Sequence, residues 1–236
     1  MTETAITTDE SLLKLRQALR LYFEFQQSML NIALYVKNRL SFKESMQSWP
    51  KYSEPVRNEY KLRPGTWAWD FLPGYCFEYY MGERTFSAHP YKAWFSLIQL
   101  LDDGSYTEDF YERPGAVDLY DCPQPAAFDP ASESGSWLAF YMDICRQDRD
   151  CALWMTLPGN AETDFLDEMF TRDRSANQKV RTFGSFAEGE IAVFQKFRLE
   201  HFANKASADA VIETFCRTVY DLTQLELIRG LSTGKP

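Results

Sequence analysis

Carboxylates are concentrated in one stretch of the chain, from Asp102 to Glu133. The stretch holds nine acidic residues and one basic residue, Arg113, so its formal charge is 1 − 9 = −8, against −9 for the whole protein. Such a field attracts cations or a basic macromolecule and repels nucleic acid. The nine are Asp102, Asp103, Glu108, Asp109, Glu112, Asp118, Asp121, Asp129 and Glu133.

Aromatic rings lie among these carboxylates, and prolines limit the freedom of the stretch. Aromatic anchors surrounded by charges are common at protein interfaces, and restricted loops lose less entropy on binding. We therefore predict a surface that binds a basic protein partner. A solvated loop that only aids solubility is the alternative. The predicted binding residues are Asp102, Asp103, Tyr106, Glu108, Asp109, Tyr111, Glu112, Asp118, Tyr120, Asp121, Trp67 and Trp69.

Two short patterns outside this stretch could also serve a site. In a strand, Trp67 and Trp69 would point to one face and form either a binding hot spot or part of the core. Asp70 and Glu78, separated by Pro73-Gly74, could converge at a turn with Asp102 or Asp103. Convergent carboxylates bind magnesium, so this set defines an alternative hypothesis, a metal-dependent hydrolase or nuclease.

Other catalytic chemistries lack their residues. The chain has only two histidines, and Cys145 and Cys151 stand in a C-x5-C spacing that does not match a zinc site. No G-x-S-x-G, Walker or G-x-G-x-x-G motif is present. We therefore predict no catalytic residue, no resident metal and no cofactor, and favour a non-enzymatic protein.

The overall composition is typical of a soluble globular protein. The 236 residues are 45% hydrophobic and 16% aromatic, enough for a large core. No apolar run is long enough for a membrane span, and the polar N-terminus has no signal-peptide pattern. Five scattered cysteines suit a reducing compartment. We expect a cytoplasmic protein that binds neither membrane nor nucleic acid.

The N-terminal segment predicts a long helix. No glycine or proline occurs before Pro50, and Thr7-Thr8-Asp9-Glu10 forms a capping box for a helix from about 9 to 46. Such a helix is either a core helix or a projecting arm that forms a homodimer. Apolar residues at helical spacing form one stripe of Leu12, Leu15, Leu19, Tyr22, Met29, Ala33, Val36 and Leu40, and a second of Phe23, Leu30 and Leu34.

The remaining residues predict a sheet followed by a helix. Ser207 would cap a final helix with Val211, Phe215, Val219, Leu222 and Leu225 on one face, stopped by Gly230. Neighbouring strand pairs favour a largely antiparallel sheet. We predict one α+β domain, 1–236, with a helical segment at 1–49, a Pro-rich connector at 50–74, and the sheet and C-terminal helix at 75–236. The expected strands are 75–81 and 92–101, then 136–145 paired with 151–157, and 179–187 paired with 190–199. A short helix is expected at 163–170, and a turn signal at 102–104 could close a hairpin.

Three functions remain open on the sequence. The first is a cytoplasmic acidic interaction protein; a specific form is an inhibitor or immunity-type protein that neutralises a toxin or nuclease, with carboxylates in place of phosphates. The second is the metal-dependent hydrolase or nuclease. The third is an assembly or adaptor protein that uses helix 9–46.

Overall fold

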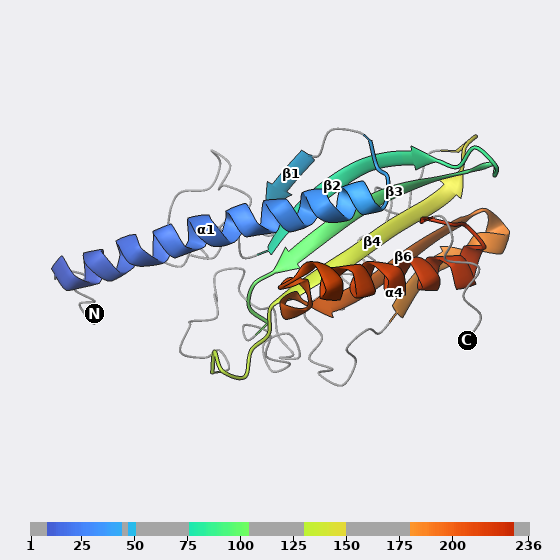
Figure 1. Cartoon of the computed structure of the whole chain (residues 1–236). Coiled ribbons are helices and arrows are strands. Elements are labelled where there is room, and N and C mark those ends of the chain that lie inside the picture. The colour runs from blue at the N-terminus through green and yellow to red at the C-terminus, as the bar shows by residue number, and fades with distance from the viewer. Residues whose placement is uncertain (1–8, 44–46, 51–75, 104–129, 150–179, 229–236) are drawn as a thin grey trace, which may run out of the picture.

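The fold combines one antiparallel sheet with two α-helices on the same face (Figure 1). The structure, a computed structural model, describes residues 9–43, 47–50, 76–103, 130–149 and 180–228. The predicted α+β class is confirmed. The elements are α1 (Asp9–Arg39), β1 (Gln47–Pro50), β2 (Cys76–Thr85), β3 (Tyr91–Leu100), β4 (Trp137–Arg146), β5 (Val180–Ser185), η3 (Phe186–Glu188), β6 (Glu190–Arg198), η4 (Leu199–Phe202) and α4 (Lys205–Thr223).

The described strands form a six-stranded sheet in the order β1-β2-β3-β4-β6-β5, and every neighbouring pair is antiparallel. The predicted pairing of 179–187 with 190–199 is confirmed by β5 and β6. Their connection ends at Gly189, whose φ of 97° lies in the left-handed region that favours glycine. Within β2 the register shifts between Tyr80 and Glu83.

One predicted strand pair is wrong. Strand β4 pairs with β3 on one side and with β6 on the other, so neither edge is open to residues 151–157. Local alternation could not reveal that β6, far along the chain, takes this place. Residues 101–136 connect β3 to β4, so the turn signal at 102–104 does not close a tight hairpin between them. Residues 151–157 themselves, and the helix predicted at 163–170, lie outside the described residues.

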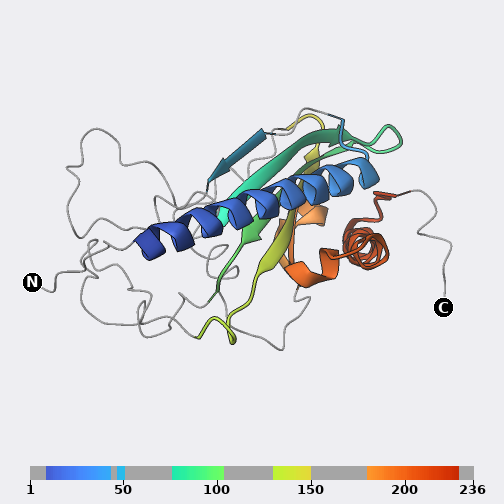
Figure 2. The same ribbon diagram turned by 60° about the vertical axis from the view of Figure 1, so that its left-hand side comes forward.

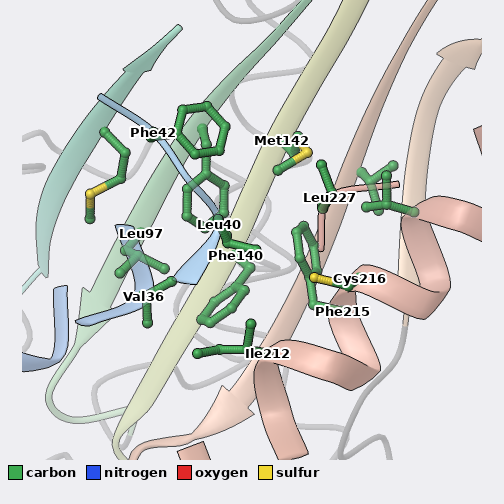
Figure 3. Packing of buried hydrophobic residues seen from close by; sticks show 14 of the residues in the cluster. Val36, Leu40, Phe42, Leu97, Phe140, Met142, Ile212, Phe215, Cys216 and Leu227 are labelled. Atoms are coloured by element: carbon green, nitrogen blue, oxygen red, sulfur yellow. The ribbon is translucent and has the colours of Figure 1, made fainter. Parts of the chain in front are cut away.

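The main core lies between the two helices and the sheet (Figure 3). Phe140 of β4 packs against Phe95 of β3 at 5.6 Å between ring centroids and against Phe215 of α4 at 5.1 Å. Both contacts are edge-to-face, an arrangement that adds a favourable electrostatic term to the apolar burial. The rings therefore join the centre of the sheet to α4.

Helix α4 follows the prediction except at its ends. The predicted buried residues Val211, Phe215 and Val219 lie inside the core. The N-cap, however, is Asn204, whose side chain accepts a hydrogen bond from the Ser207 backbone N–H at 3.0 Å. Asparagine and serine are both good N-caps, so sequence preference could not decide between them. The helix ends at Thr223, well before the predicted stop.

Helix α1 packs on the sheet over only part of its length. Its buried residues are Met29, Ala33 and Val36, and its N-terminal turns extend beyond the strands (Figures 1 and 2). The helix ends at Arg39 instead of the predicted 46. Ser41 turns the chain with a φ of 59°, and Leu40 and Phe42 on either side are buried. The core-helix and arm interpretations therefore each describe one half of α1.

Two polar contacts hold the C-terminal half of α1 in place. The guanidinium of Arg84, on β2, donates hydrogen bonds to the carbonyls of Leu40 at 2.6 Å and Leu227 at 2.7 Å. On the helix surface, Asp209 of α4 accepts hydrogen bonds from the Tyr35 hydroxyl at 2.6 Å and from Arg39 at 2.8 Å. The segments after α1 and α4 are thus joined through one arginine.

Replacing Arg84 by methionine should destabilise the protein, because two carbonyls next to buried residues lose their donor. We expect the free energy of unfolding to fall by about 2–4 kcal/mol, measured by urea denaturation. Arg84→Lys is the matched control: it keeps the charge and can reach one carbonyl, so its loss should be smaller. Equal losses in the two variants would contradict this role for the guanidinium.

The Asp209 contact predicts a specific pH dependence. The Tyr35 hydroxyl, and after it Arg39, lower the pKa of the Asp209 carboxyl below its usual 3.8. Its stabilising effect is therefore complete above pH 3.8 and is lost as the pH falls through the lower, folded-state pKa. Asp209→Asn should lower Tm at neutral pH, and the difference from wild type should shrink in acid. A constant difference in Tm across this range would refute the linkage.

Candidate functional site

The structure describes two of the twelve residues predicted to bind a partner, Asp102 and Asp103. Asp102 is partly exposed. The other ten lie outside the described residues, so the predicted acidic surface stays a prediction. They are Tyr106, Glu108, Asp109, Tyr111, Glu112, Asp118, Tyr120, Asp121, Trp67 and Trp69.

Asp103 has a role inside the fold. It is only 5% exposed, and its carboxylate accepts hydrogen bonds from the Gly135 N–H at 2.5 Å and from the Trp137 indole N–H at 2.7 Å. Its own N–H donates to the Gly135 carbonyl at 3.1 Å. Asp103 therefore fastens the end of β3 to the start of β4. An acidic run gave no signal that one of its members would be buried.

Basic residues of β6 lie beside the contact between Asp103 and Trp137. The Lys196 ammonium and the Arg198 guanidinium lie 4.7 and 4.3 Å from the centre of the Trp137 ring. The Arg198 guanidinium also fills the space that a Cβ at Gly135 would need. Cations on an aromatic face are favourable when partly desolvated. Asp103, a residue of the acidic stretch, thus lies near two basic side chains of β6.

The face of the sheet opposite the helices is buried and carries charged groups. Glu78 on β2 and Asp143 on β4 are fully buried, and Ser96 on β3 lies between these strands. The Ser96 hydroxyl donates to Glu78 at 2.6 Å. Strand β4 is buried on both faces, so it lacks the alternation that would have marked this side as interior.

A small cavity lies in this polar layer, lined by Tyr80, Trp94, Ser96 and Tyr141. It has room for about one water molecule, too little for an organic substrate. Burial first, and then the nearby charges of Asp143, Glu190 and Glu78, raise the pKa of Tyr141 far above its usual range. Tyr141 is therefore a neutral phenol under physiological conditions.

The described part of the predicted metal site does not assemble around an ion. Glu78 accepts the Ser96 hydrogen bond, and both oxygens of Asp103 accept hydrogen bonds from the chain. Among the described residues, no group of three His, Cys, Asp or Glu side chains could hold a metal. Asp70 lies outside them. Within this part of the chain, the polar layer is thus a structural feature of the sheet.

A different surface is unusually apolar. Large apolar side chains on α1 remain between 41% and 69% exposed, whereas solvent-exposed helix faces are ordinarily polar. We call the row of them along one side of the helix, interrupted at Gln26 and Gln27, the α1 stripe. It consists of Leu12, Leu15, Leu19, Phe23, Leu30 and Leu34. Exposed apolar residues gathered in this way are typical of an interaction site.

The α1 stripe is distinct from the buried face of the helix. At about 100° per residue, its centre lies roughly 90° around α1 from Met29, Ala33 and Val36. The sequence separated Phe23, Leu30 and Leu34 from the main row, but it grouped Leu12, Leu15 and Leu19 with the residues that are buried. Nothing in the residue types showed where the sheet would end.

Gln26 marks the point where α1 leaves the sheet. Its amide nitrogen donates to the Tyr22 hydroxyl at 2.8 Å, and its amide oxygen lies 3.0 Å from the Tyr79 hydroxyl of β2. The Tyr79 hydroxyl is also 2.9 Å from the Gln99 amide oxygen. Gln26 interrupts the apolar series in the sequence. Among the described residues, it makes the polar contact with a strand that lies nearest the N-terminus of α1.

The cysteines depart in part from expectation. Cys76 and Cys216 are buried free thiols, and burial raises the pKa of the Cys216 thiol to about 12. Cys145, however, is in a disulfide whose second cysteine lies outside the described residues. The compartment expected from the scattered cysteines stays a prediction.

The chain belongs to the PM0109 family, whose family model matches residues 6–222. The match runs from before α1 to the last turn of α4, so it includes both the α1 stripe and the polar layer. Comparison with curated proteins found no match, and comparison with solved structures found none. Within the described residues, none of the helices has the length and apolar character needed to cross a membrane.

The polar layer predicts a measurable stabilisation by Ser96. Ser96→Ala removes a donor to the fully buried Glu78 and should lower the free energy of unfolding by about 1–3 kcal/mol. Ser28→Ala is the control, because the exposed Ser28 hydroxyl bonds only to its own helix, at the Glu24 carbonyl; it should change stability by less than about 0.5 kcal/mol. Equal effects in denaturant titrations would argue against a stabilising Ser96–Glu78 contact.

Proposed function

We propose that this protein acts by binding protein chains through the α1 stripe, as a helical assembly or adaptor protein. The supporting observation is that α1 exposes a row of leucine and phenylalanine side chains, which begins in the turns beyond the sheet and continues beside the packed face at Leu30 and Leu34. The metal-dependent hydrolase hypothesis gains no support from the described residues, because Glu78 and Asp103 are hydrogen-bonded inside the fold and no group of three metal-binding side chains is found among them.

The anchoring of α1 suits this role. Met29, Ala33 and Val36 are buried, and Arg39 is paired with Asp209. The stripe is therefore presented on a helix whose C-terminal half is held by the body. A binding element that is already ordered loses less conformational entropy when it binds.

The energetic gain from covering the stripe is substantial. Fully burying a leucine or phenylalanine side chain stabilises by about 1.5–3 kcal/mol, and the stripe residues are roughly half exposed. Six such side chains together can offset the entropy lost on association. A helix with one apolar face is also the usual ligand of an apolar groove or of another helix.

A second candidate is the acidic interaction protein that binds a basic partner in the cytoplasm, in its specific form an inhibitor or immunity-type protein. One observation favours it. One backbone hydrogen bond, and one from the Gly135 N–H to the Asp103 carboxylate, hold the two ends of the acidic stretch at one corner of the sheet. The stretch thus begins and ends at one place in the fold, as expected of a segment presented for binding.

A capture experiment separates these two functions. Tagged full-length protein is used to capture host proteins at about 50 and about 500 mM NaCl, since salt screens charge but not apolar contact. If α1 is the docking element, binding survives high salt and is lost in Leu19→Asp. Leu21→Asp is the matched control, because Leu21 is 69% exposed but lies about 200° around the helix from Leu19.

The opposite result would favour the acidic surface. In that case binding falls steeply with salt and is the same in Leu19→Asp and wild type. Binding that is lost equally in Leu19→Asp and Leu21→Asp would contradict a specific role for the stripe.

A further inference from the structure

We propose that the α1 stripe binds a second copy of this chain, with the two α1 helices packed antiparallel around a two-fold axis. The axis passes between the helices at the level of residue 21, whose own side chain points away from the stripe. This inference rests on the proposed function, because both need the stripe as a docking surface. It goes further by naming the partner and the register of the two helices.

The stripe is complementary to itself in this arrangement. With the axis near Leu21, Leu12 lies across from Leu30 of the second copy, and Leu19 lies across from its Phe23. Leu15 meets the aliphatic part of Gln27. Two-fold symmetry repeats each contact, so one apolar row covers another along most of its length. The row between Leu12 and Leu30 is about 27 Å long at 1.5 Å per residue.

The position of the body favours the antiparallel orientation. The sheet and α4 pack on α1 from Phe25 to Leu40, whereas the turns before Phe25 extend past the strands (Figures 1 and 2). An antiparallel second copy places its body beside those N-terminal turns, at the opposite end of the helix pair. A parallel copy would bring both bodies to the same end, where they would compete for space.

Charge favours the same orientation. The residues of α1 include five Lys or Arg and three Asp or Glu, a balance of 5 − 3 = +2, whereas the described residues outside α1 include ten Lys or Arg and fourteen Asp or Glu, a balance of 10 − 14 = −4. The antiparallel pair places the N-terminal turns of one copy, which carry Lys14, beside the acidic body of the other. Opposite charges at such distances attract and set orientation.

One pair of charged residues beside the stripe allows the register to be tested. Arg20 and Glu24 lie on the same side of α1, and they make no ion pair with each other or with the rest of the described chain. With the axis near Leu21, Arg20 of each copy lies within about one helical turn of Glu24 of the other. The symmetric pair would therefore contain two such contacts.

The first test is the oligomeric state of the full chain, measured by light scattering over roughly a hundredfold range of concentration. Wild type and Leu21→Asp should have twice the mass of one chain at high concentration. Leu19→Asp should have the mass of one chain throughout. A wild-type chain that stays monomeric, or a dimer that survives Leu19→Asp, overturns the inference.

The second test exchanges charges across the axis. Arg20→Glu and Glu24→Arg should each weaken self-association, because each makes all four neighbouring charges alike. A one-to-one mixture of the two variants restores opposite charges and should associate at least about tenfold more tightly than either variant alone. A mixture that associates no better than its components would rule out the proposed register.

The outcome also separates this inference from the proposed function. If wild type is monomeric but captures a different protein that Leu19→Asp does not, the docking role of the stripe stands and the second-copy inference fails. If capture is also independent of Leu19, both fail.

Discussion

The packing of α1 on the sheet over only half its length is the constraint on which the rest of the interpretation depends. From Phe25 to Leu40 the helix contributes to the core, and Arg84 and Asp209 hold its C-terminal end. Before Phe25 none of the described strands lies beneath the helix, although its leucine residues and Phe23 remain exposed. The body of the protein thus fixes the direction of an exposed apolar helix. The proposed docking role follows from this difference between the two halves.

The sheet imposes a second constraint, because its central strands are buried on both faces. The helices cover one face with aromatic and aliphatic packing, while the other contains charged and polar groups such as Glu78 and Asp143. Buried carboxylates require hydrogen-bond donors, and Ser96 supplies one for Glu78. The buried carboxylate of Asp103 likewise has donors, the Gly135 N–H and the Trp137 indole N–H. Acidic residues that looked like surface ligands in the sequence are here part of the fold.

The sequence predicted the elements better than their partners. A long helix forms at α1 and the β5–β6 pair forms where expected, because apolar periodicity and a glycine at the turn are local signals. The neighbours of β4 could not be predicted, since strands far apart in the chain compete for the same edge. The cap of α4 was misassigned because Asn204 and Ser207 are both suitable, and only the hydrogen-bond geometry distinguishes them.

The amino-acid sequence by itself determined the fold class, the spacing of the two apolar rows on α1 and the uneven distribution of charge, because these depend on residue type and local periodicity. Tertiary structure decided which apolar row is covered and which carboxylates are interior. Those outcomes depend on where the sheet ends beneath the helix and on which donors reach each oxygen. Leu19 and Val36 illustrate this, because both are apolar residues of one helix. Val36 is buried over a strand, whereas Leu19 is exposed and lies on the N-terminal side of the contact between Gln26 and Tyr79.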